Sequence, residues 1–83
     1  MYLFLGGDTV VPEKSVVAVL DLDNTTVAKS TREFLARAQR EQKVVTVAED
    51  LPKSFCITDD EAGERIWLLS ANPATIKKRA GGL

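Results

Sequence analysis

A run of five apolar residues that ends at an acidic turn constrains the fold of this chain most strongly. Residues 16–20 are uniformly apolar, and Asp21-Leu22-Asp23-Asn24-Thr25-Thr26 follows them directly. Such a run predicts a β-strand over residues 15–22 with both faces covered. The cover has to come either from the following helix on one side and a second subunit on the other, or from a closed sheet. The polar residues after the run predict a turn into a helix.

Length and composition restrict the classes of protein. With 83 residues the chain forms one domain, residues 1–83, with a thin core. Its 45% hydrophobic and 28% charged content is that of an ordinary globular domain. The net charge of −1 means that any contact with DNA requires a local basic patch. The segment Met1–Leu5 lacks a basic flank and meets Gly6-Gly7-Asp8, so we expect no signal peptide, no membrane span and a cytoplasmic location.

The cysteine and histidine content predicts neither a zinc site nor a cysteine nucleophile. Cys56 is the single cysteine, so it has no internal disulfide partner, and the chain contains no histidine to activate it or to complete a zinc site. We interpret Cys56 as a small buried hydrophobic residue. No cofactor and no metal site are predicted.

The remaining pattern predicts an α+β fold with the order β-β-β-α-β-β-β-α in a small, mostly antiparallel sheet. The first hairpin joins residues 2–5 to 9–11 across a glycine turn that needs positive φ. A further strand is expected over residues 43–48. A second hairpin is expected to join residues 53–58 to 65–70 across an acidic loop, residues 59–64. Phe55 and Trp67, in its strands, are expected in the core.

Two helices are predicted. The first is capped by Thr26 and ends near Gln42, with an apolar stripe of Val27, Thr31, Phe34, Leu35 and Ala38. An alternative start uses Ser30 and Glu33 as a capping box, but it leaves Val27 outside the stripe. The last helix has Asn72 as its cap, Pro73 at its first position and Gly81 beyond its end.

The acidic turn also resembles the nucleophile motif of haloacid-dehalogenase-type phosphatases. Asp21 would attack phosphorus, Asp23 would act as acid and base, and Thr25 would complete the motif, with Mg²⁺ bridging carboxylates and phosphate. Those enzymes use a doubly wound parallel sheet, and each of its βαβ units needs about 30 or more residues. The residues after Asp21 are too few for such a sheet, so we expect no enzymatic activity and interpret the acids as the polar end of a strand.

A basic ridge is predicted on the first helix, opposite its apolar stripe. Residues 29–43 carry five basic and two acidic residues. Lys29, Arg32, Arg40 and Lys43 cluster on one side of a helix with 3.6 residues per turn. Flexible cations in this arrangement favour contact with phosphates. The alternative is the ordinary solvated face of a helix. Lys77-Lys78-Arg79 is a second local basic group. The alternative to phosphate contact there is that these cations complement the negative end of the last helix.

The whole order of segments resembles the RemB-type branch of the Rem family, small bacterial regulators of extracellular-matrix genes. The segments that carry the resemblance are Met1–Val11, Asp21–Thr26, Thr31–Leu35, Leu51–Phe55 and Thr75–Ala80. The resemblance implies a non-enzymatic DNA-binding regulator. In the RemA branch it further implies a ring-shaped homo-oligomer that engages DNA around its outside, with a fold likened to LytTR-type DNA-binding domains.

The resemblance also implies candidate DNA-contacting residues. In the RemA branch, a basic residue before the third strand and an arginine pair before the later hairpin are tied to DNA. The first position corresponds to Lys14 in this chain. The second corresponds to Leu51-Pro52-Lys53, where only Lys53 is basic. The helix argument adds Lys29, Arg32 and Arg40. The leading hypothesis is therefore a non-enzymatic homo-oligomer that binds double-stranded DNA and regulates matrix or biofilm genes. The alternatives are an oligomer that interacts only with proteins and, more remotely, the Mg²⁺-dependent phosphatase. No membrane or small-molecule partner is expected.

Overall fold

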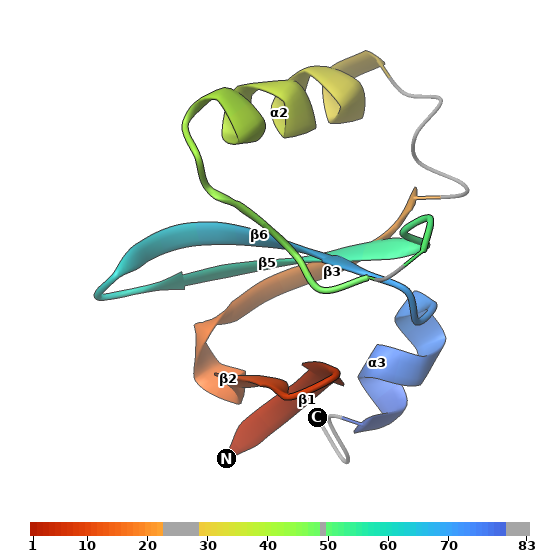
Figure 1. Ribbon diagram of the computed structural model, residues 1–83. Coiled ribbons are helices and arrows are strands. Elements are labelled where there is room, and N and C mark those ends of the chain that lie inside the picture. Colours follow the sequence, from red (N-terminus) through yellow and green to blue (C-terminus); the bar gives the residue numbers. More distant parts are fainter. Residues whose placement is uncertain (23–28, 49, 80–83) are drawn as a thin grey trace.

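The chain folds into three layers around a four-stranded sheet. The computed structural model describes residues 1–22, 29–48 and 50–79. The central sheet has the strand order β3-β5-β6-β4 and contains β3 (Val16–Asp21), β4 (Val44–Thr46), β5 (Ser54–Asp60) and β6 (Gly63–Leu69). Helix α2 (Lys29–Arg40) lies over one face (Figure 1). The hairpin of β1 (Tyr2–Gly6) and β2 (Thr9–Pro12), together with α3 (Pro73–Arg79), lies on the other face.

The predicted α+β class and element order are confirmed, but the strands form two sheets. Among the described residues, β1 and β2 pair only with each other, and the short η1 helix (Glu13–Ser15) separates β2 from β3. In the central sheet β3, β5 and β6 are antiparallel, whereas β4 runs parallel to β6. Strand β4 is therefore a parallel edge strand of a mostly antiparallel sheet.

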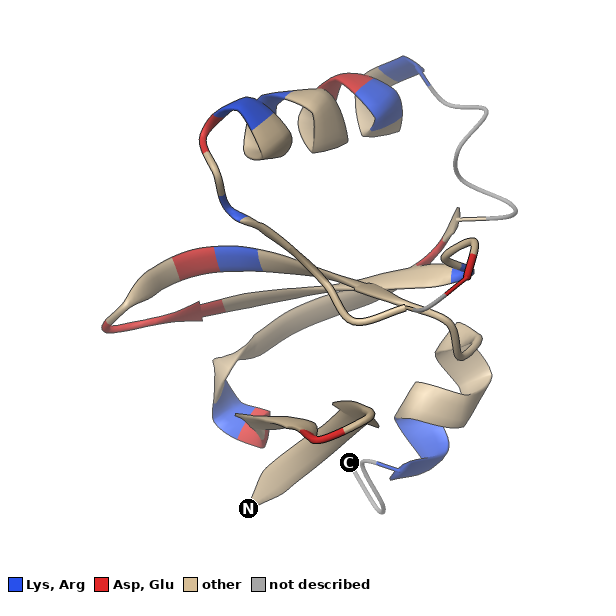
Figure 2. Cartoon of the chain, in the orientation of Figure 1, with Lys and Arg blue, Asp and Glu red and all other residues tan. Residues whose placement is uncertain are grey.

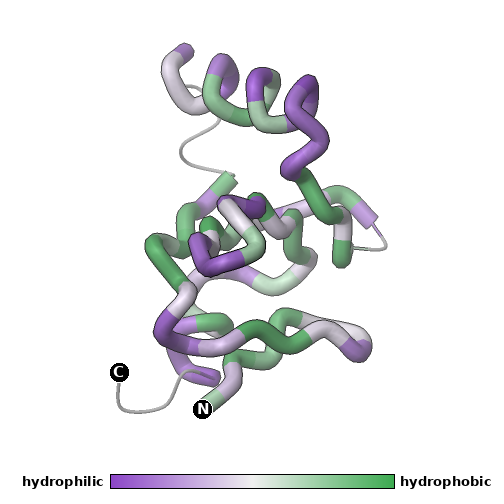
Figure 3. Tube along the Cα trace, turned by 90° about the vertical axis from the view of Figure 1, so that its left-hand side faces the viewer, coloured by the Kyte–Doolittle hydropathy of each residue, from purple (hydrophilic) through white to green (hydrophobic). Residues whose placement is uncertain are grey.

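Alternation along the two central strands builds a separate core on each face of the sheet. Phe55 of β5 and Ile66 of β6 pack towards α2, where Leu22 and Ala38 are also buried. Cys56 and Leu69 point the other way and pack with Leu3, Leu5, Val11 and Ile76 of the hairpin and α3. This is the period of two that places successive strand residues on opposite faces. Figure 3 shows the same layers from the side, with hydrophobic segments concentrated in the sheet and the hairpin layer.

The predicted core residues take up the expected positions. Phe55 is 1% exposed and Cys56 is fully buried. Trp67 is half-buried against the hairpin-side core, and its Nε1 donates a hydrogen bond to Thr58 Oγ1 at 2.9 Å. Phe34 and Leu35 lie against the α2-side core, as the apolar stripe predicts. The predicted cap Thr26 and the stripe residue Val27 lie outside the described residues.

Both turn predictions are informative, one because it is confirmed and one because it is wrong. Gly6 and Gly7 adopt φ values of 135° and 53° between β1 and β2, a region that residues with a Cβ rarely enter. The predicted six-residue acidic loop is instead a turn of Glu61 and Ala62, because pairing continues to Asp60 and Gly63. Asp60 Oδ1 accepts a hydrogen bond from the Ala62 backbone N–H at 2.8 Å, and this bond closes the turn.

The first helix is shorter at its end than predicted. It ends at Arg40, and Gln42 adopts a φ of 60°, which no residue of a right-handed helix can have. The predicted strand over residues 43–48 is reduced to β4. The last helix begins as predicted, because Asn72 Oδ1 accepts a hydrogen bond from the Thr75 backbone N–H at 2.9 Å. Within the described residues, no helix is long and apolar enough to cross a membrane.

The third strand is only partly covered in a single chain, so the closed-sheet alternative is wrong, and cover by a second subunit stays a prediction. Strand β3 lies at the edge of the central sheet, with β5 on one side. Val17 is 65% exposed and Leu20 is 36% exposed. Two apolar residues of the run, Val17 and Leu20, are therefore left without cover within one chain.

Candidate nucleic-acid interface

The outward face of α2 carries four basic residues spread along the length of the helix. Within Lys29–Arg40 there are four basic residues and one acidic residue, Glu33. The apolar side of the helix packs on the sheet, so the charged side faces solvent, and Lys29, Arg32, Arg37 and Arg40 are all exposed. We call these four residues the α2 basic face. Its position follows from the helical period, which places the charged residues opposite Phe34 and Ala38.

One carboxylate interrupts the α2 basic face. Glu33 Oε1 lies 3.9 Å from Lys29 Nζ, one helical turn away, and both side chains are strongly exposed. An exposed pair of this kind is worth about 0.3–0.5 kcal/mol, so either partner is easily released to another ion. A shallow hollow lined by Ser30, Glu33, Phe34, Arg37 and Arg40 runs along the same side of the helix. The α2 basic face can therefore present several guanidinium groups to an extended polyanion.

Arg37 is a member of this face that the ridge prediction did not name. It lies about one turn before Arg40 and lines the same hollow. The signal was present in the sequence, because a residue three positions from Arg40 shares its side of the helix.

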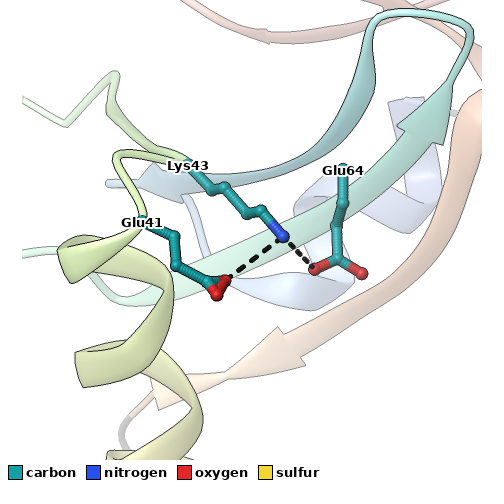
Figure 4. Close-up of polar contacts among 3 residues, drawn as sticks. All are labelled: Glu41, Lys43 and Glu64. Atoms are coloured by element: carbon teal, nitrogen blue, oxygen red, sulfur yellow. Dashed lines mark ion pairs between the residues drawn. The ribbon is translucent and has the colours of Figure 1, made fainter.

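Lys43 does not belong to the α2 basic face, contrary to the prediction. The helix ends before it, and the chain turns down towards β4, so Lys43 is no longer in phase with Arg40. Its Nζ lies 3.3 Å from Glu41 Oε1 and 4.0 Å from Glu64 Oε1 (Figure 4). Two carboxylates therefore offset its charge, and it ties the end of α2 to β6.

The structure separates the two residues carried over from the resemblance from the helix. Lys14 is exposed in η1, on the hairpin side of the central sheet, whereas α2 covers the opposite side (Figure 1). Lys14 also shares a shallow hollow with Asp59, Asp60 and Glu61 of the β5–β6 turn. Lys53 is exposed and directly precedes β5, where its carbonyl oxygen accepts a hydrogen bond from the Leu22 N–H at 2.9 Å.

The charge distribution therefore has one extended basic surface on α2, a second basic group at Lys77, Lys78 and Arg79 of α3, and separate cations elsewhere. Figure 2 shows basic segments along α2 in one layer, while the basic end of α3 lies in the opposite layer. The projecting β5–β6 turn is acidic. Of the five candidate residues, the structure brings together Lys29, Arg32 and Arg40, and it places Lys14 and Lys53 elsewhere.

The acidic motif of the phosphatase hypothesis is only partly described. Asp21 closes β3 and is in register with Ser54 of antiparallel β5, whereas Asp23 and Thr25 lie outside the described residues. Within residues 1–22, 29–48 and 50–79, no group of three potential ligand side chains is close enough to hold a metal ion.

Comparison with known proteins places this architecture in a family. A family model described as RemA-like, extracellular matrix regulatory protein A-like, matches residues 3–80. This range includes all the described strands and helices except the first residue of β1. No curated protein matches the chain.

Proposed function

Because the chain belongs to the RemA-like family of extracellular matrix regulatory proteins, we propose that it is a DNA-binding transcriptional regulator that acts as a homo-oligomer. Within that family we place it in the RemB-type branch, since Leu51-Pro52-Lys53 occupies the position of the RemA arginine pair. The observation that carries DNA binding is the α2 basic face, four exposed cations on one helix of a chain whose net charge is −1.

The proposed contact is with the phosphate backbone rather than with base edges. Flexible Lys and Arg side chains on an exposed helix neutralise phosphates and release condensed counterions. The absence of the arginine pair moves the expected contact from the start of β5 to α2. Lys53 can extend the contact only if the DNA reaches the edge of the central sheet, and Lys14 is held among acids on the opposite side.

Assembly strengthens binding of this kind. Four cations per copy bind DNA weakly alone, but copies that present their α2 faces together raise the effective concentration for each further contact. The uncovered apolar residues of β3 support self-association, because an exposed edge strand is usually protected in a soluble protein.

Fluorescence anisotropy with labelled duplex DNA at low and high salt tests the proposal. We expect binding at low salt that weakens steeply as salt rises, and a variant with Lys29, Arg32 and Arg40 changed to Ala should lose most of the affinity. Arg65→Ala is the control for each of the three single substitutions to Ala, because it removes one exposed charge on β6 rather than on α2. Absence of binding at low salt, or equal loss in the control, would refute the α2 surface.

A second candidate is a protein-interaction oligomer that does not bind DNA. The same exposed apolar residues favour it, since they serve assembly whether or not DNA is present. A stable oligomer that fails to retain DNA at low salt would select this function over the first.

We also propose that the chain is not an enzyme. The antiparallel pairing of β3 with β5 supports this, because the phosphatase mechanism draws its groups from the ends of neighbouring parallel strands. Phosphatase activity that requires Mg²⁺ and disappears in Asp21→Asn would contradict the proposal.

A further inference from the structure

The outer face of the β1–β2 hairpin is an uncovered apolar surface. Phe4 lies opposite Val10 in the hairpin register, and Tyr2 shares their face because it is two residues from Phe4. Tyr2, Phe4 and Val10 are 69%, 42% and 52% exposed, respectively. Leu3 and Leu5 on the inner face are buried against the central sheet. This hairpin patch, Tyr2, Phe4 and Val10, therefore lies on the side of the hairpin that faces away from the central sheet.

A second uncovered apolar surface is the free edge of β3. Strand β5 pairs with one side of β3, and no strand pairs with the other side among the described residues. Val17 lies where the β3–β5 register shifts, and Leu20 lies nearer the end of the strand. Shallow hollows flank Leu20, one bounded by Phe34 of α2 and the other by Pro73 of α3. The edge is thus a grooved surface, not a flat one.

The two surfaces have borders of opposite charge. The Arg79 guanidinium carbon lies 5.1 Å from the centroid of the Phe4 ring, which places a cation at the hairpin patch. The start of β3 follows η1, and the hollow at η1 is lined by Asp59, Asp60 and Glu61 together with a single cation, Lys14. A basic border on one surface and an acidic border on the other attract when the surfaces belong to different copies. The small net charge means that two copies do not repel each other overall.

We infer that the free edge of β3 in one copy packs against the hairpin patch of a second copy. The inference rests on the homo-oligomer of the proposed function and names its contact surfaces. Val17 and Leu20 supply the apolar side of the contact, and Tyr2, Phe4 and Val10 supply the other side. Because the two surfaces differ, the contact is heterologous, and repetition gives a ring if its rotation closes. The inference also explains why an edge strand carries the five-residue apolar run.

Matched aspartate substitutions on the two surfaces test the inference. Val17→Asp changes the β3 edge, Phe4→Asp changes the hairpin patch, and Leu51→Asp places the same charge at a residue that is 86% exposed and on neither surface. Native mass spectrometry and light scattering, over a range of protein and salt concentrations, measure assembly. We expect Val17→Asp and Phe4→Asp each to raise the apparent Kd by about tenfold or more, and Leu51→Asp to leave it unchanged.

Mixing the two variants distinguishes a heterologous contact from a symmetric one. The Val17→Asp copy keeps an intact hairpin patch, and the Phe4→Asp copy keeps an intact β3 edge. We expect each variant alone to be monomeric and an equimolar mixture to form a pair that does not grow further. If Phe4→Asp does not fold, as judged by circular dichroism, Tyr2→Asp replaces it, because Tyr2 is more exposed.

The outcomes separate failure of this inference from failure of the proposed function. A wild-type oligomer that both variants leave intact overturns the surfaces but keeps the oligomer. Dissociation by Val17→Asp without an effect of Phe4→Asp, or a mixture that stays monomeric, overturns the heterologous contact. A wild-type chain that is monomeric at every concentration overturns the assembly part of the proposed function itself.

Discussion

Lys43 and Glu41 form an ion pair across the turn that ends α2, with Lys43 Nζ 3.3 Å from Glu41 Oε1. Glu64 of β6 lies 4.0 Å from the same nitrogen, so the lysine bridges the helix end and the central sheet. Both interactions are partly exposed and contribute little to stability. Their effect on function is larger, because they remove one cation from the surface that we propose for DNA.

This arrangement predicts that Arg40→Ala and Lys43→Ala differ in their effect on DNA binding, although each removes one positive charge. Arg40 is exposed on α2, whereas Lys43 already has two carboxylate neighbours. We expect Arg40→Ala to lower the slope of log K against log salt by about one, and Lys43→Ala to change it little. Anisotropy titrations at several salt concentrations measure both slopes. Equal slopes for the two variants would contradict the assignment of the α2 basic face.

The same reasoning predicts a weak role for Lys14. Its hollow contains Asp59, Asp60 and Glu61, and a phosphate approaching Lys14 would be repelled by them. Lys14→Ala should therefore reduce DNA affinity less than Arg32→Ala does. Asp59→Asn combined with Asp60→Asn removes part of the repulsion, and it should raise low-salt affinity only if DNA does reach η1. A loss in Lys14→Ala as large as that in Arg32→Ala would place the DNA on the hairpin side of the sheet.

The sequence predicted the parts of the fold that depend on local rules. The glycine turn, the Asn72 cap and the apolar stripe of the first helix each follow from a few neighbouring residues. The β5–β6 turn was harder to predict, because charged Asp59 and Asp60 suggested a loop although they continue the strand pairing. The edge position of β3 depends on which strands pair over long distances, and no local pattern encodes that choice.

The candidate site was predictable only in part for a related reason. Helical periodicity placed Lys29, Arg32 and Arg40 on one face, and the structure keeps them there. Helical periodicity would place Lys43 on the same face only if the helix continued to residue 43. The helix ends before Lys43, and Gln42 has a positive φ. The position of Lys14 beside the acidic turn joins segments more than 40 residues apart in the sequence, so spacing alone carried no information about it.

The core on the α2 side predicts a large loss of stability when its central aromatic ring is removed. Phe55 is 1% exposed and packs with Leu22, Ala38 and Ile66 beneath α2. We expect Phe55→Ala to lower the free energy of unfolding by about 3–5 kcal/mol, and Leu51→Ala, a few residues earlier but exposed, to change it by less than about 0.5 kcal/mol. Urea titrations at one fixed protein concentration compare the variants, because assembly would also affect stability. Similar unfolding midpoints would contradict the two-core packing.

Trp67 allows a second test of packing that uses a conservative pair of variants. Its Nε1 donates a hydrogen bond to Thr58 Oγ1, and Thr58 is buried. Thr58→Val keeps the shape but removes the acceptor, so we expect a loss of about 1 kcal/mol in the free energy of unfolding, while Thr58→Ser should retain most of it. Fluorescence of Trp67, the single tryptophan, follows the unfolding transition. Equal stabilities for the Val and Ser variants would show that the bond contributes nothing.

Cys56 predicts a dependence of stability on alkaline pH. Burial between the two sheets raises the pKa of the Cys56 thiol from 9.0 to about 11, since the thiolate loses its hydration there. The unfolded chain therefore releases this proton at lower pH than the folded chain does. The contribution to stability is complete below pH 9 and is lost as pH rises towards about 11, and it amounts to about 3 kcal/mol at most. Urea titrations of wild type and Cys56→Ala from pH 7 to pH 10.5 measure the effect. We expect the stability difference between them to shrink above pH 9, and parallel curves would show that the thiol does not control it.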